Sequence, residues 1–457
     1  MARKSHSRAL SIWANGEHVG LWVIPASGEM ELRYASSWMH SPVGRPLSLS
    51  LPFGVDERPL KGAPVQNYFD NLLPDTPEIR KRIATRFKTE TVESFDLLKA
   101  VGRDCIGAVQ LLGEDEEPQR VNKVDGTPLS DDDIELILQR TLGTDPLWTE
   151  DGNDNFRISL AGAQEKTALL RSGDKWLLPH GSTPTTHILK LPIGFIGNGK
   201  VDFNTSVENE WLCLAILRAF GLPVANADIM TFGRQKVLCV ERFDRLYSER
   251  RRAWLRLPQE DFCQALGVAP HMKYEDQGGP GVRSIAKILQ HSMRAEYDLA
   301  TFMCAHILFW MLAAPDGHAK NFSIRLLARG RFEMTPLYDV MSIWPVEGDA
   351  LNQWSWHKAK LAMAMCGTSG KHYRMRDVVR RHFNHTAQLC HYGPDAEPLI
   401  TGVLERTPGV IESVSSSLPP GFPQRVASRI FKGLRDSAAR LEAMPPNGIA
   451  AASRRRR

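Results

Sequence analysis

The seven cysteines of this 457-residue chain form no metal or redox motif. No two of them make a Cys-x-x-Cys pair, and none has the cysteine–histidine spacing of a zinc site. Several lie within apolar runs, which favours buried and reduced thiols. The sequence therefore does not indicate a disulfide-bonded secreted protein or a zinc protein.

Long apolar runs are also lacking. The longest, Leu299 to Ala314, is about one helical turn short of a membrane span and contains His306. The basic N-terminal residues are not followed by an apolar stretch, so we expect no signal peptide. With 42% hydrophobic residues, a net charge of +5 and a pI of about 8.8, the composition is that of an ordinary, mildly basic globular protein. We expect a soluble, cytoplasmic protein without a membrane partner.

No internal repeat and no Walker motif is present. Residues 1–115 have the pattern of a small α/β unit, with a hairpin over Asn15-Gly16, a third strand at 32–35 and an edge strand at 46–52 bracketed by prolines. Helices are predicted to end near Asp75, to begin at Thr76-Pro77, and to cover 95–101.

Residues 116–155 are acidic and polar and are interpreted as a connector, with a possible helix at 130–141. Residues 156–245 are strand-rich, with expected strands at 158–160, 166–171, 176–178, 187–191 and 237–242 and one helix at 207–220. Residues 246–441 are expected to be helical, and 442–457 to be a disordered basic tail. A strand-rich lobe followed by a helical lobe is the order of a two-lobed kinase.

The stretch Asp316-Gly317-His318-Ala319-Lys320-Asn321 has the spacing of a phosphoryl-transfer catalytic loop. In such loops the Asp accepts the proton of the attacking hydroxyl, and an Asn five residues later holds magnesium. Asp339 follows a short predicted hairpin, where a kinase carries its second metal-binding acid. In isolation, an ordinary Asp-Gly turn explains the same residues equally well.

Upstream segments supply the other parts of a nucleotide site. The small residues of Ser159–Thr167 would let backbone N–H groups approach phosphates, although a tight hairpin loop explains this stretch as well. Lys190 lies in a predicted strand one hairpin further on, where a kinase carries its phosphate-binding lysine. Its helix partner would be Glu208 or Glu210, and we prefer Glu210. Backbone groups of Glu241–Asp244 at a strand end would contact adenine, but a salt-bridged strand end fits equally well.

Taken together, these stretches resemble the HipA family of bacterial toxin kinases over nearly the whole chain to about residue 440. The similar stretches are 46–52, 69–75, 94–109, 156–170, 183–194, 240–245, 255–266, 278–281, 316–323 and 335–340. The loop at Asp316 is also similar to that of phosphatidylinositol-kinase-like enzymes. The resemblance implies an α/β, two-lobed protein-kinase-like fold with an extra N-terminal subdomain and an all-helical C-terminal lobe.

The resemblance also implies an ATP- and magnesium-dependent Ser/Thr protein kinase toxin. Asp316 would be the catalytic base, Asn321 and Asp339 the magnesium ligands, and Ser159 the autophosphorylated residue. The implied ATP-binding residues are Ala161, Gly162, Ala163, Gln164, Glu165, Lys166, Lys190, Glu241, Arg242, Phe243, His318 and Tyr338. The implied partners are a dimeric helix-turn-helix antitoxin (HipB-like), operator DNA reached mainly through it, and a protein substrate such as glutamyl-tRNA synthetase. Bound to its antitoxin, the protein would be nucleoid-associated.

Two other functions fit parts of the pattern. A lipid or small-molecule kinase would use the same loop, and a non-catalytic corepressor would bind the antitoxin without ATP turnover. The intact set of Asp316, Asn321 and Asp339 argues against the second, because a pseudokinase needs none of the three. Basic residues at 371, 374, 376, 380 and 381 and at 454–457 could contact DNA phosphates, but a solvated face explains them at least as well.

Overall fold

The computed structural model describes residues 7–54, 56–142, 159–161, 164–196, 201–350 and 352–446. The chain divides into two compact units. Unit 1 comprises residues 1–191, 230–271 and 323–332, and unit 2 comprises residues 192–229, 272–322 and 333–457. The boundary therefore runs through the segment 156–245 that the sequence indicated as one lobe, because helix α6 (Ser206–Ala219) belongs to unit 2.

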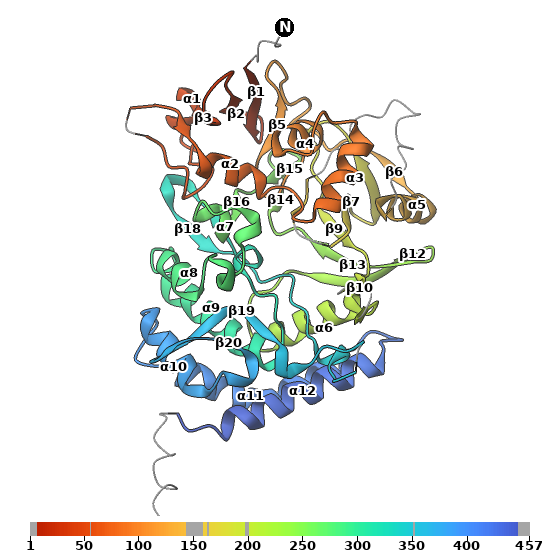
Figure 1. Ribbon diagram of the computed structural model, residues 1–457. Coiled ribbons are helices and arrows are strands. Elements are labelled where there is room, and N and C mark those ends of the chain that lie inside the picture. Colours follow the sequence, from red (N-terminus) through yellow and green to blue (C-terminus); the bar gives the residue numbers. More distant parts are fainter. Residues whose placement is uncertain are drawn as a thin grey trace, which may run out of the picture. The chain divides into compact units, whose positions relative to one another are not determined.

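Unit 1 begins with a five-stranded antiparallel sheet in the order β4-β3-β2-β1-β5 (Figure 1). Its strands are β1 (Arg8–Ala14), β2 (Glu17–Ile24), β3 (Glu31–Tyr34), β4 (Leu60–Lys61) and β5 (Gln110–Gly113). The turn between β1 and β2 lies at Asn15 and Gly16, whose φ angles are 50° and 89°. Asn and Gly tolerate positive φ, and this is the hairpin that the sequence predicted.

Short helices complete the core of this part of unit 1. They are α1 (Ser36–Met39), α2 (Ala63–Asp70), α3 (Pro77–Phe87) and α4 (Ser94–Val101). The Trp22 ring from the sheet stacks on Phe69 of α2 at 4.0 Å and lies 5.0 Å from Phe95 of α4. The helix start at Thr76-Pro77 is confirmed, because Thr76 is the N-cap of α3.

The edge strand predicted at 46–52 is wrong. The described backbone there is irregular. Part of its hydrogen bonding is to side chains and not to a neighbouring strand. Glu260 Oε1 accepts the Leu49 N–H at 2.9 Å, and the Ser48 and Ser50 hydroxyls donate to the Gln264 carbonyl oxygen at 3.1 and 2.6 Å. The serines of this alternating pattern thus hydrogen-bond to a segment more than 200 residues away and do not belong to a pleated strand.

The second sheet of unit 1 has the order β12-β13-β9-β7-β8-β6. Its strands are β6 (Gly126–Leu129), β7 (Lys166–Ser172), β8 (Lys175–Pro179), β9 (His187–Lys190), β12 (Ala227–Phe232) and β13 (Gln235–Glu241). The segment 116–155 is more than a connector. It supplies β6 and helix α5 (Asp131–Leu142), whose Ile134 and Leu138 share a buried cluster with Leu169 and Leu189. Ser159 and Leu160 are not in a strand, and Ile158 lies outside the described residues.

Unit 1 ends in smaller pieces. Strands β14 (Arg245–Ser248) and β15 (Ala253–Arg256) form a hairpin, and helix α7 (Phe262–Ala265) follows β16 (Gln259–Asp261). Strand β16 pairs with β17 (Ser323–Leu326), and β18 (Phe332–Met334) completes that three-stranded sheet. Strands β17 and β18 are the short hairpin that the sequence predicted ahead of Asp339.

A buried ionic cluster holds the β14–β15 hairpin to the residues that follow α4. Asp104 accepts hydrogen bonds from Arg245 at 2.9 Å and from Arg256 at 3.0 Å, and it lies 3.3 Å from Arg242. Asp244 lies 2.8 Å from Arg242 and 2.9 Å from Arg245. Burial alone would raise the pKa of Asp104, but the three guanidinium groups outweigh burial and hold that pKa far below its usual range.

Unit 2 is built around helix α9 (Ala295–Met311), which is buried on nearly every side, as the sequence predicted. The other long helices are α6, α8 (Val282–Leu289), α10 (Arg380–Leu389), α11 (Glu397–Ser416) and α12 (Gln424–Glu442) (Figure 1). Both α11 and α12 contact α9. None of the helices in the described ranges combines the length and apolar composition that a bilayer crossing requires. Residues 447–457, most of the predicted tail, lie outside the described residues.

The prediction of an all-helical C-terminal lobe needs a correction. The predicted range 246–441 contains strands β15 to β18, and β19 (Lys360–Gly367) and β20 (Gly370–Arg374) form an antiparallel hairpin there. Outside that range, β10 (Gly194–Ile196) pairs with β11 (Val201–Phe203) in unit 2. Alanine and methionine make up half of β19, and alanine has low strand propensity. Packing of β19 against α10 overrides this local preference.

Candidate active site

The loop that follows α9 in unit 2 is folded tightly on itself. The Asp316 carbonyl oxygen accepts the Asn321 side-chain amide at 2.6 Å and the His318 N–H at 2.8 Å. A Cβ atom at Gly317 would lie 2.6 Å from the Phe309 ring, so only glycine fits there without movement of that ring. The five-residue spacing recognised in the sequence is therefore a closed structural unit.

The Asp316 carboxylate projects from this loop and is half exposed, at 50% of its side-chain area. The Tyr274 hydroxyl donates to Asp316 Oδ1 at 2.7 Å. His318 is buried, and its Nε2 lies 3.9 Å from the same oxygen. The Tyr274 ring packs edge-on against the His318 ring at 5.1 Å. A carboxylate that is oriented but still accessible suits a general base.

Sequence reasoning missed Tyr274. The residue lies in a compact turn that needs glycine, because Gly278 has φ of 94° and a Cβ at Gly279 would lie 1.8 Å from the Met272 carbonyl oxygen. The run of glycines at 278–281 was the available signal, but nothing in the sequence connects it to Asp316.

The neighbouring Glu275 fixes this turn to the β19–β20 hairpin. Glu275 accepts the Ala364 N–H at 2.7 Å and forms an ion pair with Lys371 at 2.7 Å. Since Glu275 is adjacent to Tyr274, the hairpin helps to set the position of the hydroxyl that reaches Asp316.

Asp339 has a left-handed backbone, with φ of 60°. The two preceding residues hold it in place. Leu337 forms a parallel bridge with Val224, and the Tyr338 hydroxyl donates to the Lys320 carbonyl oxygen at 2.9 Å. A non-glycine residue in this conformation carries strain of about 1–3 kcal/mol, and such strain clusters at functional sites.

The donor set of this loop suits magnesium. Because the Asn321 NH₂ group donates to Asp316, its Oδ1 is the side-chain atom that can bind a cation. In the predicted site Asp339 would add a carboxylate. Magnesium prefers such hard oxygens and takes few of them from protein, the rest coming from substrate phosphate and water. The described residues accordingly contain no cluster of three His, Cys, Asp or Glu side chains of metal-binding geometry.

In unit 1, Lys190 of β9 is buried and directly opposes Lys166 of β7 in the antiparallel register. Opposed residues in such a pair project from the same face of the sheet. Two like charges side by side are unfavourable unless negative charge lies nearby. The two predicted phosphate-binding lysines therefore lie side by side on one face of the second sheet, and their role in binding phosphate stays a prediction.

The expected ATP loop is described only in part, because Gly162 and Ala163 lie outside the described residues. Ala161 precedes this gap, and Gln164 after it donates through Nε2 to the Leu191 carbonyl oxygen. Glu165 forms an ion pair with Arg82 of α3. This last contact was not expected from the sequence.

Ser159 is buried, with 1% of its surface exposed. Its hydroxyl donates to the Leu72 carbonyl oxygen at 2.6 Å, and its N–H donates to the Asp104 carbonyl oxygen at 3.1 Å. Phosphorylation of Ser159 would require the hydroxyl to leave the Leu72 carbonyl oxygen and become accessible.

The adenine-binding role predicted for backbone groups of Glu241, Arg242 and Phe243 stays a prediction. The Arg242 N–H donates to the Thr186 carbonyl oxygen at 2.9 Å, and the Arg242 carbonyl oxygen accepts the Arg245 N–H at 3.2 Å. The Arg242 guanidinium lies in the buried ionic cluster with Asp104 and Asp244. Glu241 is exposed at the end of β13, and Phe243 is partly exposed.

The choice between Glu208 and Glu210 on α6 stays open. Both carboxylates are buried, at 3% and 2% exposure, so burial does not favour either. The role of Glu210 as partner of Lys190 remains a prediction.

The basic residues at 371–381 are less available to DNA than the sequence indicated. Three of the five pair with acids: Lys371 with Glu275 at 2.7 Å, Arg376 with Asp377 at 3.4 Å, and Arg380 with Glu397 at 3.0 Å. Arg374 and Arg381 are exposed and have no carboxylate within ion-pair distance among the described residues, and Arg454–Arg457 lie outside them.

Comparisons with known proteins show which protein family the chain is similar to. A family model described as HipA-like C-terminal domain matches residues 158–411, and one described as HipA N-terminal domain matches residues 10–112. The chain is 35% identical over 339 residues to "Putative kinase Y4mE" of Sinorhizobium fredii, covering 73% of this chain and 77% of that protein. It is 29% identical over 337 residues to the serine/threonine-protein kinase toxin HipA of Shewanella oneidensis, covering 68% and 70%.

The fold agrees with that class. The chain matches HipA in the Shewanella oneidensis complex of HipA, HipB and operator DNA with a TM-score of 0.75 at 22% identity, covering 95% of this chain and 98% of that one. The fold is thus the α/β, two-lobed kinase-like fold predicted from the sequence, and the relatives are named as kinases. The chain belongs to the HipA family.

Proposed function

We propose that this chain is a magnesium-dependent Ser/Thr protein kinase and the toxin of a toxin–antitoxin pair. The observation that carries the proposal is the Asp316 carboxylate, half exposed and oriented by Tyr274 in a closed loop, in a chain of the HipA family. The relatives named as kinases support the class of reaction.

In this proposal Asp316 accepts the proton of an attacking serine or threonine hydroxyl. The Tyr274 hydroxyl fixes the rotamer of the carboxylate, and Asn321 fixes the loop backbone. Lys166 and Lys190 of unit 1 neutralise phosphate charge. Asn321 and Asp339 would hold magnesium, which when bound neutralises charge on the transferred phosphoryl group.

The substrate and the regulation of the kinase are proposed from the resemblance to the HipA family. The substrate is a translation enzyme such as glutamyl-tRNA synthetase, and its phosphorylation arrests growth. Autophosphorylation at Ser159 switches the enzyme off, because a phosphate of about −1.5 to −2 charge cannot occupy the buried position of that hydroxyl. The segment that carries Ser159 therefore leaves, and ATP loses its backbone donors.

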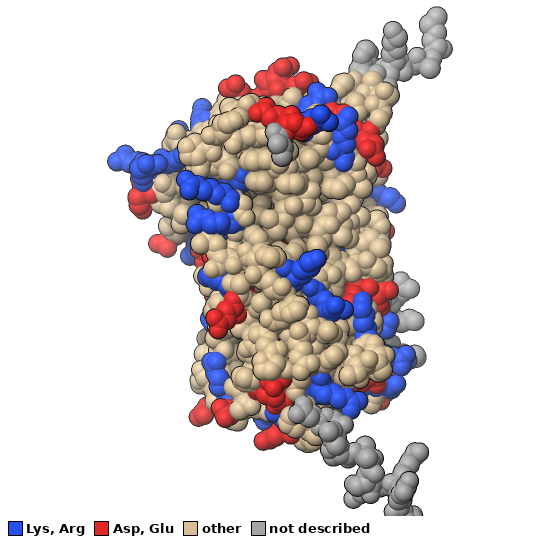
Figure 2. All heavy atoms as spheres, turned by 90° about the vertical axis from the view of Figure 1, so that its left-hand side faces the viewer, with Lys and Arg blue, Asp and Glu red and all other residues tan. Residues whose placement is uncertain are grey.

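A dimeric helix-turn-helix antitoxin neutralises the kinase, and operator DNA is reached mainly through it. Figure 2 shows that acidic and basic side chains are interspersed on one face of the molecule and separated by uncharged surface. Such a mixture offers weak attraction to a phosphate backbone. The pairing of Lys371, Arg376 and Arg380 with acids supports the same division of roles.

The test is phosphotransfer from labelled ATP in the presence of magnesium. The purified protein is offered glutamyl-tRNA synthetase, a phosphoinositide vesicle and a bacterial extract in parallel. We expect label on protein serine only, lost when magnesium is chelated. Label on the lipid would identify a lipid kinase, and antitoxin binding without any ATP turnover would identify a non-catalytic corepressor.

The site residues are tested by ATP affinity as a function of magnesium concentration. We expect Asn321→Ala and Asp339→Ala to weaken magnesium-dependent ATP binding, whereas Lys190→Ala weakens it even at saturating magnesium. The first two act through the ion and the lysine acts directly on phosphate. The same magnesium dependence in all three variants would contradict these assignments.

A further inference from the structure

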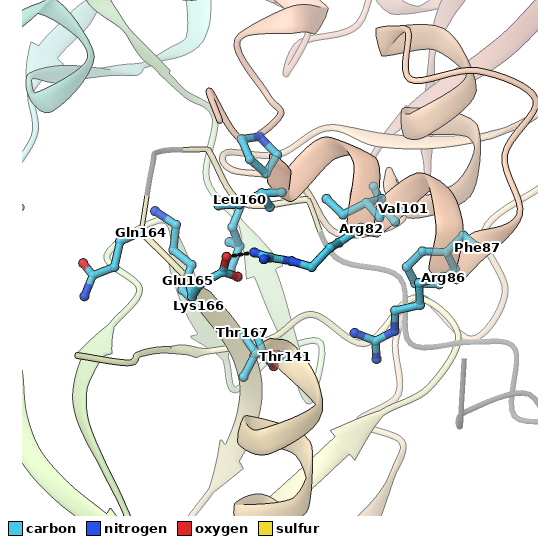
Figure 3. A pocket seen from close by; sticks show the side chains of 13 residues that line it. Arg82, Arg86, Phe87, Val101, Thr141, Leu160, Gln164, Glu165, Lys166 and Thr167 are labelled. Atoms are coloured by element: carbon cyan, nitrogen blue, oxygen red, sulfur yellow. Dashed lines mark ion pairs between the residues drawn. The ribbon is translucent and has the colours of Figure 1, made fainter. Parts of the chain in front are cut away.

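A cavity of about 100 Å³ opens in unit 1 between helix α3 and the segment that ends in β7 (Figure 3). One wall is apolar and includes Ile83, Phe87 and Leu160. The polar side chains that line it are Arg82, Arg86, Thr141, Gln164, Glu165, Lys166 and Thr167. The cavity thus has three basic side chains and one acidic side chain in its wall.

The acidic side chain of the wall, Glu165, already has a basic partner. Glu165 forms an ion pair with Arg82, which Figure 3 shows as the contact between α3 and the segment preceding β7. The Arg86 guanidinium also lines the cavity and adds a positive charge to its wall.

Arg86 is the unusual residue of this cavity. It lies one helical turn after Arg82 on α3 and is half buried. No carboxylate lies within ion-pair distance of it among the residues that the structure describes; its recorded contact is with the Phe87 ring, at 5.6 Å. Burial, followed by repulsion from Arg140, lowers the pKa of Arg86. A partly desolvated guanidinium such as that of Arg86, with no carboxylate beside it in the described part of the chain, is stabilised by an anionic ligand.

We propose that this cavity binds a phosphate or a phosphate monoester, held by Arg86 and Arg82. The guanidinium group presents several N–H donors in a plane that matches phosphate oxygens, and pairs of arginines bind this group well. The Thr167 hydroxyl in the wall is a further donor of the right type, whereas the Thr141 hydroxyl donates to the Ile137 carbonyl oxygen at 2.9 Å. The volume holds several water-sized groups, which is the size of a phosphoryl group. The apolar wall suits the carbon part of an ester.

Occupancy has a structural consequence, because Arg82 serves both the anion and Glu165. A bound anion competes with Glu165 for the same guanidinium and so loosens the tether between α3 and the segment preceding β7. If anion binding changes ATP affinity, that effect rests on the proposed function, in which the segment preceding β7 covers the ATP phosphates. Anion binding itself does not rest on the proposed function.

The experiment uses full-length wild-type protein that mass spectrometry shows to be unphosphorylated, with inorganic phosphate as the probe and no ATP present. Binding is measured by calorimetry and by thermal unfolding at constant ionic strength, with chloride as the reference anion. The site variant is Arg86→Ala. The matched control is Lys81→Ala, which removes an exposed cation from the same helix.

We expect phosphate to raise the Tm of the wild type saturably, and Arg86→Ala to weaken phosphate binding at least about tenfold while Lys81→Ala stays within about twofold. Without phosphate, Arg86→Ala should be as stable as the wild type or more stable, because it removes a desolvated charge without an acidic partner. That result separates loss of the site from loss of the fold.

Three outcomes would overturn the proposal: no saturable phosphate signal in the wild type, equal phosphate affinity in wild type and Arg86→Ala, or an equal loss in Lys81→Ala. Because ATP is absent, a failure here is distinct from a failure of the kinase assignment. Conversely, phosphate binding that depends on Arg86 would stand even if no kinase activity were found.

Discussion

The ionic cluster around Asp104 in unit 1 and the loop around Asp316 in unit 2 each centre on one aspartate. Asp104 is buried and surrounded by the guanidinium groups of Arg242, Arg245 and Arg256. Asp316 is half exposed and accepts a hydrogen bond from the neutral Tyr274 hydroxyl. A carboxylate that is fully neutralised by its surroundings maintains structure, whereas one left accessible is available for proton transfer.

A third carboxylate sharpens this comparison. Glu260 is buried like Asp104, but its hydrogen-bond donor is the neutral Leu49 N–H, and its Oε2 has no partner in the described part of the chain. Burial therefore raises the pKa of Glu260 to about 8, the opposite direction from Asp104. Burial alone thus does not decide whether a carboxyl group is ionised. The presence or absence of a neighbouring cation decides it.

The largest expected effect is on catalysis. Asp316→Asn should reduce phosphotransfer by about 10²–10⁴-fold, because it removes the proposed general base. Its Tm should stay within a degree or two of the wild type, since the side chain is half exposed and the loop bonds to Asn321 and His318 use the backbone oxygen of residue 316. The control is Asp377→Asn, which changes a surface carboxylate of the same unit. Wild-type phosphotransfer in Asp316→Asn would refute the assignment.

The second effect is on stability and completes the contrast. Asp104→Asn should lower the free energy of unfolding by about 3–5 kcal/mol, because it leaves buried guanidinium groups without their charge partner. Denaturant unfolding measures this directly. Asp377→Asn should cost less than about 1 kcal/mol, because its pair with Arg376 is solvent-exposed. Similar losses in the two variants would mean that the cluster contributes little.

The third expected effect is on the pH dependence of stability, in which the two buried carboxylates differ. A carboxyl whose folded pKa is raised contributes most below its unfolded pKa, and that contribution is lost as pH rises through the folded value. Glu260 should therefore destabilise the wild type progressively between about pH 5 and 8. Glu260→Gln should remove this dependence and be more stable at pH 8 by about 1–3 kcal/mol. Stability curves of the two proteins that stay parallel from pH 5 to 9 would rule out a neutral Glu260.

The smallest effect concerns how Asp316 is oriented. Tyr274→Phe should lower kcat about 3–10-fold, the usual contribution of one hydrogen bond, with KM for ATP little changed. It should also alter the pH dependence of kcat, which loss of packing alone would not do. Tyr297→Phe, an exposed tyrosine of the same unit, is the control. An unchanged kcat and pH profile in Tyr274→Phe would show that this hydroxyl is dispensable.

The sequence by itself determined the features that depend on near neighbours. The Asn15-Gly16 hairpin, the start of α3 at Pro77, the buried helix α9 and the closed loop from Asp316 to Asn321 each follow from residues within one or two turns of chain. Backbone preferences, turn chemistry and periodicity act at that range, so pattern alone suffices.

The tertiary structure decided what depends on distant partners. Tyr274 reaches Asp316 across 42 residues, and Ser159 is buried against Leu72 across 87. The guanidinium of Arg242 pairs with Asp104, which is 138 residues earlier in the chain. No periodicity encodes such pairings, because they arise only when separately formed elements pack and each buried polar group must find a partner.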